Sequence, residues 1–227
     1  MSTLAFRERP ASGEPQGLLV LHHGRGADEH DLLSLAEQLD PPRRLHVATP
    51  RAPLSVPGWP GYHWYLVPRV GFPDTATFDA AYRELAGFHD ELWRRTGIAP
   101  AATVLGGFSM GSVMSYALGL GSGRPPPAGI LAFSGFVPTV DGWQADLQSR
   151  KGLAAFIAHG RPDPVIDVEF ARRARDLLRA GDLEVSYHES EVGHNIDPAH
   201  VRIACDWLAR IFPPERSGGG GHPSPER

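Results

Sequence analysis

A serine between two glycines is the strongest candidate for a reactive group in this chain. The segment Gly107-Phe108-Ser109-Met110-Gly111 has the pattern G-x-S-x-G. It follows a short apolar run and precedes a run with helical periodicity, so it predicts a tight turn from a strand into a helix. Such a turn projects the serine Oγ above the sheet, where the helix N-terminus favours a developing oxyanion. An ordinary glycine-rich turn is the alternative, whereas the spacing fits neither a dinucleotide loop nor a P-loop.

Two further side chains follow in the order that a nucleophilic serine on such a turn requires, an acid and then a histidine. Asp163 comes just after a predicted strand, in HGRPDPVID, and His194 follows the next one, in HESEVGHNID. Ligands of open α/β sheets meet the loops at the carboxyl ends of the strands, where we expect both residues. Asp163 competes with Asp167, which resembles the N-cap of the next helix. Among 11 histidines, His194 best fits an imidazole on a loop, because a glycine precedes it and a predicted helix follows.

The segment LLVLHHGRGADEHD, residues 18–31, allows a metal site, a phosphate loop or a loop that assists catalysis. A metal site would use His22, His23, Asp28 and His30. Adjacent residues of an extended chain point to opposite sides, however, so the two neighbouring histidines would not share an ion. No other group of histidines and acids in the sequence has zinc-ligand spacing. We therefore expect no metal and no cofactor, and expect the two adjacent histidines to brace the loop.

Short apolar runs alternate with longer amphipathic segments along most of the chain. This alternation is typical of βαβ units, so the sequence predicts an α/β fold with a mostly parallel central sheet and helices on both faces. The predicted strands are residues 18–21, 45–48, 103–107, 130–133, 155–158 and 183–187. The predicted helices are residues 31–39, 77–95, 110–120, 168–180 and 198–211.

One domain, residues 15–213, accounts for these elements. Residues 1–14 are expected to form an N-terminal extension, and residues 214–227 are rich in Gly, Pro and Ser, which predicts a disordered tail. Residues 50–76 interrupt the alternation with six prolines and several aromatic residues. A segment this long without regular structure is usually functional or disordered, and its aromatic residues favour an ordered wall of a pocket.

The composition excludes several classes of function. Of the 227 residues, 41% are hydrophobic and 21% are charged, which is typical of a globular domain. A net charge of −4 leaves no basic surplus for nucleic acid or for an anionic membrane. No apolar run has the length of a signal peptide core or a spanning helix, so we expect a cytoplasmic protein without stable membrane insertion. The single cysteine, Cys205, precludes an intrachain disulfide, and its spacing indicates a buried helical position.

Taken together, these blocks resemble the phospholipase/carboxylesterase family of α/β-hydrolases, which contains bacterial carboxylesterases and acyl-protein thioesterases. The resemblance runs from about residue 15 to residue 212. Its motifs are H-G-x-G at 23–26 with an Asp at 28 after one inserted residue, G-F-S-x-G at 107–111, H-G-x-x-D-x-V-V-P at 159–167, and G-H-x-I at 193–196. Asp167 replaces the family's final Pro, Met110 stands where its thioesterases often have Gln, and Arg25 stands where Leu is common.

The resemblance implies an α/β-hydrolase fold and ester hydrolysis through an acyl-enzyme. Ser109 would attack the carbonyl, His194 would accept the serine proton, and Asp163 would orient the imidazole. The backbone N–H groups of Arg25 and Met110 would stabilise the oxyanion. The partner would be a small-molecule ester of short to medium chain length, and the protein a monomer or a homodimer. A thioesterase, a lysophospholipase and a peptidase share this triad, and a catalytically silent binding protein is an alternative outside the enzymes.

Five apolar or aromatic residues are candidates for lining the substrate pocket. They are Tyr65, Phe72, Phe136, Val137 and Ile196. The alternative is that the aromatic residues of segment 61–73 only pack this segment onto the sheet, which is the interpretation we favour for Trp64.

The Arg25 side chain has two interpretations. Its guanidinium could attract an ester that carries a carboxylate or a phosphate. It could instead form an ion pair with a nearby acid such as Asp28 or Glu29, which is the interpretation that the sequence favours.

Overall fold

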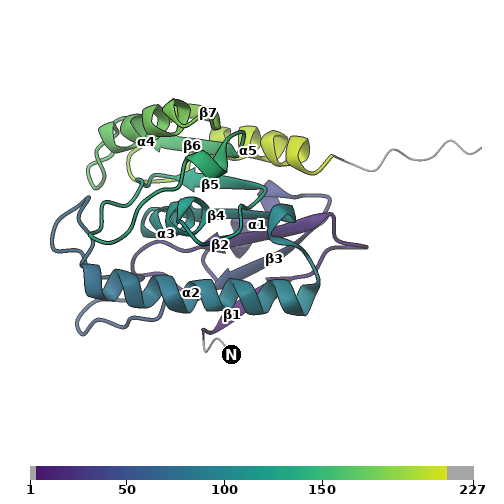
Figure 1. Ribbon diagram of the computed structural model, residues 1–227, viewed down its shortest axis with the longest axis horizontal. Helices are drawn as coiled ribbons and strands as arrows, with labels where there is room; N and C mark the ends of the chain where they lie inside the picture. Colours follow the sequence, from purple (N-terminus) through teal and green to yellow (C-terminus); the bar gives the residue numbers. More distant parts are fainter. Residues whose placement is uncertain (1–3, 214–227) are drawn as a thin grey trace, which may run out of the picture.

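A single sheet of seven strands runs through the described part of the chain, residues 4–213 of a computed structural model (Figure 1). The strand order is β1-β3-β2-β4-β5-β6-β7, and every neighbouring pair is parallel except β1 with β3. The strands are β1 (Phe6–Arg9), β2 (Gly17–His22), β3 (Leu45–Pro50), β4 (Thr103–Phe108), β5 (Gly129–Phe133), β6 (Ala154–Gly160) and β7 (Glu184–Ser190). Because parallel strands end at the same edge, the loops after β2, β4, β6 and β7 meet there.

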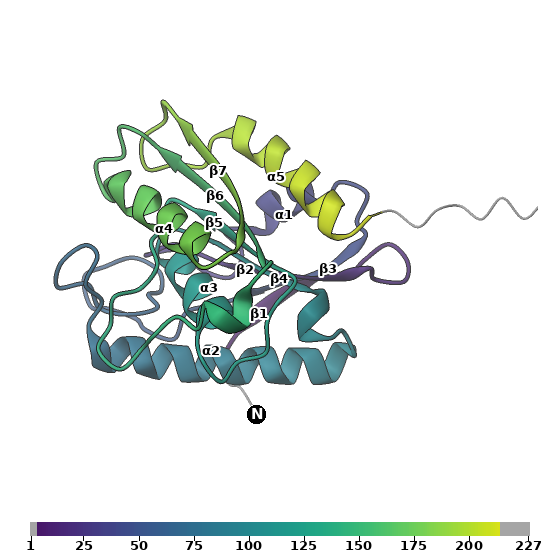
Figure 2. The same cartoon turned by 45° about the horizontal axis from the view of Figure 1, so that its top comes forward.

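Helices cover both faces of the sheet, as Figure 2 shows. They are α1 (Leu33–Leu39), α2 (Thr75–Thr96), α3 (Met110–Leu120), α4 (Glu169–Ala180) and α5 (Pro198–Ile211), with short 3₁₀ turns at Pro100–Ala102 and Gln148–Arg150. Alternate side chains of β2 point to opposite faces. Leu18 and Val20 therefore pack with α2 and α3, whereas Leu19 and Leu21 pack with α1 and α5. The predicted α/β architecture is confirmed, with predicted bounds that differ by a few residues.

The first residues of the described chain contribute the strand β1 to the sheet. Within this segment β1 pairs with β3 along the antiparallel edge of the sheet. Its last residue, Arg9, is buried, and Nη2 of its guanidinium lies 2.6 Å from Oδ2 of Asp40. The same nitrogen donates to the carbonyl oxygen of Leu45. A buried charge is tolerated when it is paired and hydrogen-bonded, and here the pair fastens β1 to the sheet.

The segment between β3 and α2 has neither helix nor strand, yet it lies firmly against the carboxyl edge of the sheet. Isolated β-bridges join Ala27 to Tyr62 and Leu54 to His63. Trp64 is fully buried, and its indole N–H donates to the carbonyl oxygen of His23 over 2.9 Å. This segment, residues 51–74, is therefore an ordered wall beside the loop that follows β2, and it is called the wall segment below.

The tail predicted at 214–227 lies outside the described residues. Among the helices of residues 4–213, none is both long enough and apolar enough to cross a membrane.

Candidate active site

Ser109 occupies a strained position between β4 and α3. Its backbone has φ 54° and ψ −119°, a conformation that a non-glycine residue rarely adopts. The turn is held by a hydrogen bond from the Ser109 N–H to the carbonyl oxygen of Phe133, at the end of β5. Strain of this kind persists only where the surrounding structure enforces it, and it is characteristic of functional sites.

The two glycines of the turn are required by the close approach of the backbones around it. A Cβ on Gly107 would clash with the backbone of Gly111, and a Cβ on Gly111 would overlap the carbonyl oxygen of His22. Strand β4, helix α3 and the end of β2 therefore meet without intervening side chains. The pattern G-x-S-x-G thus has a steric cause in this chain.

The structure brings the three predicted reactive side chains together. Nε2 of His194 lies 2.9 Å from Oγ of Ser109, and Nδ1 of the same ring lies 2.7 Å from Oδ2 of Asp163. Ser109 and Asp163 are buried, whereas the His194 side chain is partly exposed. The ring of Phe108 lies against the imidazole, with centroids 5.0 Å apart. This geometry allows proton transfer from serine to imidazole while the carboxylate holds the ring in one orientation.

The carboxylate of Asp163 is held in its ionised form. Its Oδ1 accepts hydrogen bonds from the N–H groups of Val165 and Ile166, at 2.8 and 2.9 Å. Burial alone would raise the pKa of Asp163, but the hydrogen bonds from His194 and from these two N–H groups outweigh it and lower the pKa below its ordinary value. Asp163 therefore offers a fixed negative charge to the imidazole.

The loops that carry Asp163 and His194 cross at a glycine. A Cβ on Gly160, the last residue of β6, would overlap the carbonyl oxygens of Val192 and Gly193. This contact sets the separation of the two loops. One competing histidine, His159, lies behind the reactive groups, because its Nε2 donates to the carbonyl oxygen of Ile166 over 2.8 Å and lies 3.3 Å from Oδ2 of Asp163.

The two predicted oxyanion donors lie on the loops next to Ser109. Met110 is the first residue of α3, so its N–H has no acceptor one turn earlier in the helix. The N–H of Arg25 takes part in none of the loop and turn hydrogen bonds of residues 4–213. The N–H of Gly26 donates to Tyr62 over 2.9 Å and fixes the loop after β2. Two free N–H groups beside the serine are what a tetrahedral oxyanion requires.

A cavity of about 70 Å³ opens beside Ser109. Three of the predicted pocket residues, Tyr65, Phe72 and Phe136, line it together with Arg25 and Met110. The other two lie elsewhere. Val137 faces a separate hollow on the far side of Phe136, and Ile196 packs against the core between the sheet and α5.

Several cavity residues were missed by sequence reasoning. They are Val67, Val70, Gly71, Pro73, Val165 and Ile166. The first four belong to the irregular segment, whose sequence has no periodicity from which the facing side could be derived. The last two follow Asp163 directly, so their position next to a predicted catalytic loop was an available signal.

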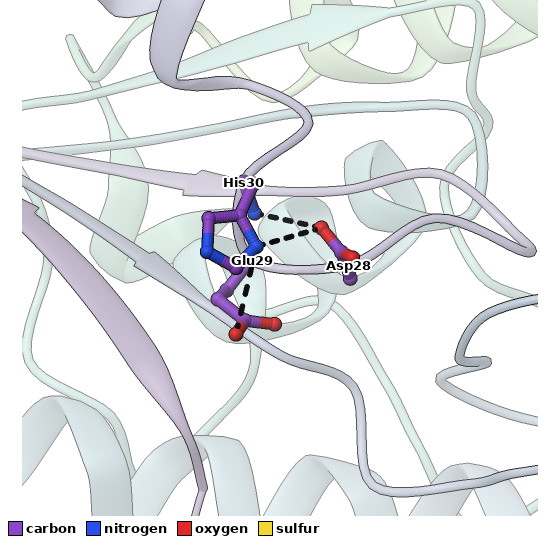
Figure 3. Close-up of side chains that lie close together, drawn as sticks. All are labelled: Asp28, Glu29 and His30. Atoms are coloured by element: carbon purple, nitrogen blue, oxygen red, sulfur yellow. Dashed lines mark hydrogen bonds and ion pairs between the residues drawn. The ribbon is translucent and has the colours of Figure 1, made fainter.

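The candidate metal ligands of the first loop are not brought together as one site. His23 turns inward, where Nδ1 donates to its neighbour's carbonyl oxygen and Nε2 accepts from the N–H of Ala52. Within residues 4–213, one group of three possible ligands is compact, formed by Asp28, Glu29 and His30 (Figure 3). The Glu29 carboxylate is already engaged by Arg51, with both N–O distances 2.6 Å. This pair lowers the pKa of Glu29 to about 2 and makes the carboxylate a structural anchor.

His22 belongs to a buried chain of hydrogen bonds behind the nucleophile turn. The hydroxyl of Ser115 donates to the carbonyl oxygen of Gly111, so it accepts from Nδ1 of His22 over 2.8 Å. Nε2 of His22 is then the acceptor for Nε2 of His89, which lies 3.1 Å away. Burial lowers the pKa of His89 to about 3 and that of His22 well below its ordinary value. Both imidazole rings are therefore neutral, and the two residues brace the core behind the nucleophile turn.

A mostly parallel sheet with a strained serine turn after its central strand defines an α/β-hydrolase. The chain belongs to the phospholipase/carboxylesterase family, whose sequence profile matches residues 8–211. This membership makes the protein a hydrolase and confirms the family resemblance found in the motifs.

Several known proteins are similar to this chain in sequence or in fold. Acyl-protein thioesterase 1 of Mycosarcoma maydis is 28% identical over 239 residues, which covers 90% of this chain and 95% of the relative. The match to acyl-protein thioesterase 1 of Emericella nidulans is 29% identical and spans about half of each chain, 54% and 53%. The carboxylesterase of Bacillus cereus has the same fold, with a TM-score of 0.81 at 24% identity, over 93% of this chain and 96% of that one.

Proposed function

We propose that this protein is a serine carboxylesterase that hydrolyses short- to medium-chain esters through an acyl-enzyme. The observation that carries the proposal is the continuous chain from Oγ of Ser109 through His194 to the carboxylate of Asp163, with successive distances of 2.9 and 2.7 Å. The distances and the order of these groups are those of a general base and its orienting acid.

The reaction would proceed in two steps. Ser109 attacks the carbonyl carbon while His194 takes its proton, and the N–H groups of Arg25 and Met110 bind the oxyanion of the tetrahedral intermediate. His194 then returns the proton to the leaving alcohol, which leaves an ester on Ser109. Water, activated by the same imidazole, releases the acid and restores the serine. None of these steps requires a metal or an organic cofactor.

The preference for modest chain length is supported by the cavity beside Ser109. Its volume is about 70 Å³, and Phe72 and Phe136 close it on the side of a larger hollow of about 740 Å³. A short acyl group fits within this volume, whereas a long one must extend beyond it.

An acyl-thioesterase is the second candidate. It is favoured by the relatives named acyl-protein thioesterase 1, one of which matches this chain over nearly its whole length. The same triad cleaves esters and thioesters, so the leaving group distinguishes the two candidates.

The test is a panel of p-nitrophenyl esters of increasing chain length, measured beside an acyl thioester and a lysophospholipid. We expect the highest kcat/KM on a short or medium ester, inhibition by a serine-directed phosphonate attached to Ser109, and no effect of EDTA. Ser109→Ala should lose more than about 10³ in rate, because triad members act as a unit. Near-normal rates in this variant would refute the mechanism, and a clear preference for the thioester would favour the second candidate.

A further inference from the structure

The side chain of Arg25 lies at the boundary between two hollows. Together with Tyr65 and Val67, it lines both the cavity at Ser109 and a second hollow of about 280 Å³. The second hollow is also lined by Val56, Trp59, His63, Leu66 and Pro68. A group bound there would thus lie directly beside the cavity that holds the scissile bond.

The guanidinium of Arg25 has no acidic partner within residues 4–213. Its contact is with the ring of Trp59, whose centroid lies 4.7 Å from Cζ. The expected ion pair with Asp28 or Glu29 is wrong, because Asp28 bonds to His30 (Figure 3). The Glu29 carboxylate is held by Arg51 instead. A cation–π contact orients a guanidinium without neutralising its charge or occupying its N–H donors.

Two other polar groups of the second hollow also lack partners in the described chain. The hydroxyl of Tyr65 makes no hydrogen bond there, and Nε2 of His63 is buried without one. Burial raises the pKa of Tyr65 well above its ordinary value, although the charge of Arg25 opposes the rise. The hydroxyl therefore stays protonated and can donate a hydrogen bond beside the guanidinium.

We propose that Arg25 is a specificity-determining residue that binds a carboxylate carried by the ester substrate at a distance from the scissile bond. A planar guanidinium with free N–H donors matches the two oxygens of a carboxylate. The Tyr65 hydroxyl supplies a further donor, and apolar neighbours such as Val56 and Val67 cover the carbon chain that links the carboxylate to the ester. The assignment rests on the proposed esterase function, and it narrows the substrate class to anionic esters.

Two pairs of esters test the assignment. Monomethyl glutarate against dimethyl glutarate places the carboxylate in the acyl half, and 4-acetoxybenzoate against methyl 4-acetoxybenzoate places it in the alcohol half. For each pair, selectivity is kcat/KM of the anionic ester divided by kcat/KM of its neutral partner. We expect Arg25→Met to lower the selectivity of at least one pair by about tenfold to a hundredfold, the usual range for losing hydrogen bonds to a charged group.

The selectivity ratio separates the effect of the Arg25 side chain from the effect of its backbone N–H. Any displacement of the Arg25 N–H slows the anionic and neutral esters alike and cancels. Arg69→Met is the matched control, because Arg69 is an exposed cation over Phe72, on the same segment, but lines neither hollow. It should leave selectivity within about twofold, as expected when an exposed charge is screened.

The outcomes distinguish the two levels of the proposal. If Arg25→Met changes both selectivities by less than about twofold while the wild type hydrolyses the esters, the carboxylate site is refuted and the esterase function stands. An equal loss of selectivity in Arg69→Met would show that a general electrostatic effect, and not a carboxylate site at Arg25, causes the selectivity. If no ester is hydrolysed in a Ser109-dependent way, the proposed function itself fails, and the carboxylate site with it.

Discussion

The backbone at Gly111 lies so close to the carbonyl oxygen of His22 that a Cβ on the glycine would overlap this oxygen. Gly111 belongs to the first turn of α3, and His22 ends β2. The contact therefore sets the distance between the serine turn and the loop that carries Arg25, the proposed second oxyanion donor.

Gly111→Ala should separate these two loops. We expect kcat/KM to fall by about 10² or more, because a displacement of about 1 Å at a reacting group has that effect. Overpacking should also lower the free energy of unfolding by about 1–3 kcal/mol. Gly87→Ala is the control, since a Cβ on Gly87, within α2, meets nothing within 4 Å and should stabilise the helix slightly. Unchanged kinetics in Gly111→Ala would mean that the contact does not position the site.

Asp163→Asn should reduce kcat by about 10³–10⁴ with a small change in KM. The amide oxygen can still accept from the N–H groups of Val165 and Ile166, so the loop should keep its shape, but the imidazolium of His194 loses its negative partner. Asp167→Asn is the control, because Asp167 Oδ1 only accepts from the N–H of Glu169. The measurement is steady-state kinetics of both variants on one ester. An equal loss of kcat in Asp163→Asn and Asp167→Asn would contradict the role of Asp163.

Glu29→Gln should weaken the attachment of the loop after β2 to the wall segment. The carboxylate of Glu29 is buried and bonds twice to Arg51, so we expect the free energy of unfolding in urea to fall by about 1–3 kcal/mol. Glu37→Gln is the control, because the Glu37–Arg43 pair is exposed and such pairs contribute little. If the two substitutions had the same effect, Glu29 would not anchor the loop.

The stability of the protein should fall as the pH is lowered from 7 to 5. His89 has a folded pKa of about 3 against 6.5 in its ordinary state, so the unfolded chain binds a proton in this range and the folded chain does not. By linkage this costs about 2 kcal/mol for His89 at pH 5. The carboxylates with lowered pKa, such as Glu29 and Glu189, lose their contribution only below about pH 4.5.

His89→Gln isolates this effect. Glutamine keeps an N–H donor for Nε2 of His22 but does not titrate. Urea unfolding at pH 7 and pH 5 should show a loss of stability that is about 2 kcal/mol smaller in the variant than in the wild type. The same loss in both proteins would show that other groups govern the acid sensitivity.

The proximity of the three candidate catalytic residues could be predicted from local patterns because the topology gathers them. Ser109, Asp163 and His194 each follow a strand, and the strands β4, β6 and β7 run in the same direction. Their ends must therefore meet at one edge of the sheet, whatever the details of the loops. The tight turn at Ser109 was likewise predicted, from the glycines at 107 and 111.

Other features depend on partners distant in sequence and could not be predicted. The strand β1 contains Arg9. From the sequence alone an arginine is expected on the surface, because its pairing with Asp40 is not visible there. The Arg25 ion pair was wrong for a related reason, because Arg51 competes successfully for Glu29 from 22 residues away. Val137 and Ile196 were predicted to line the pocket because they lie near motif residues in the sequence. Such proximity does not determine where a side chain points.

The wall segment is fastened at Tyr62 and Trp64, which bond to Ala27 and Met110, and it is closed on itself where His63 pairs with Leu54. Beyond these anchors, Val67 and residues 70–73 line the cavity but include none of the residues proposed to attack the ester, transfer the proton or bind the oxyanion. This division separates the residues that line the cavity from those proposed to carry out the reaction. Substitutions in that short stretch can change which acids and alcohols the enzyme accepts, while the machinery that breaks the bond stays as it is.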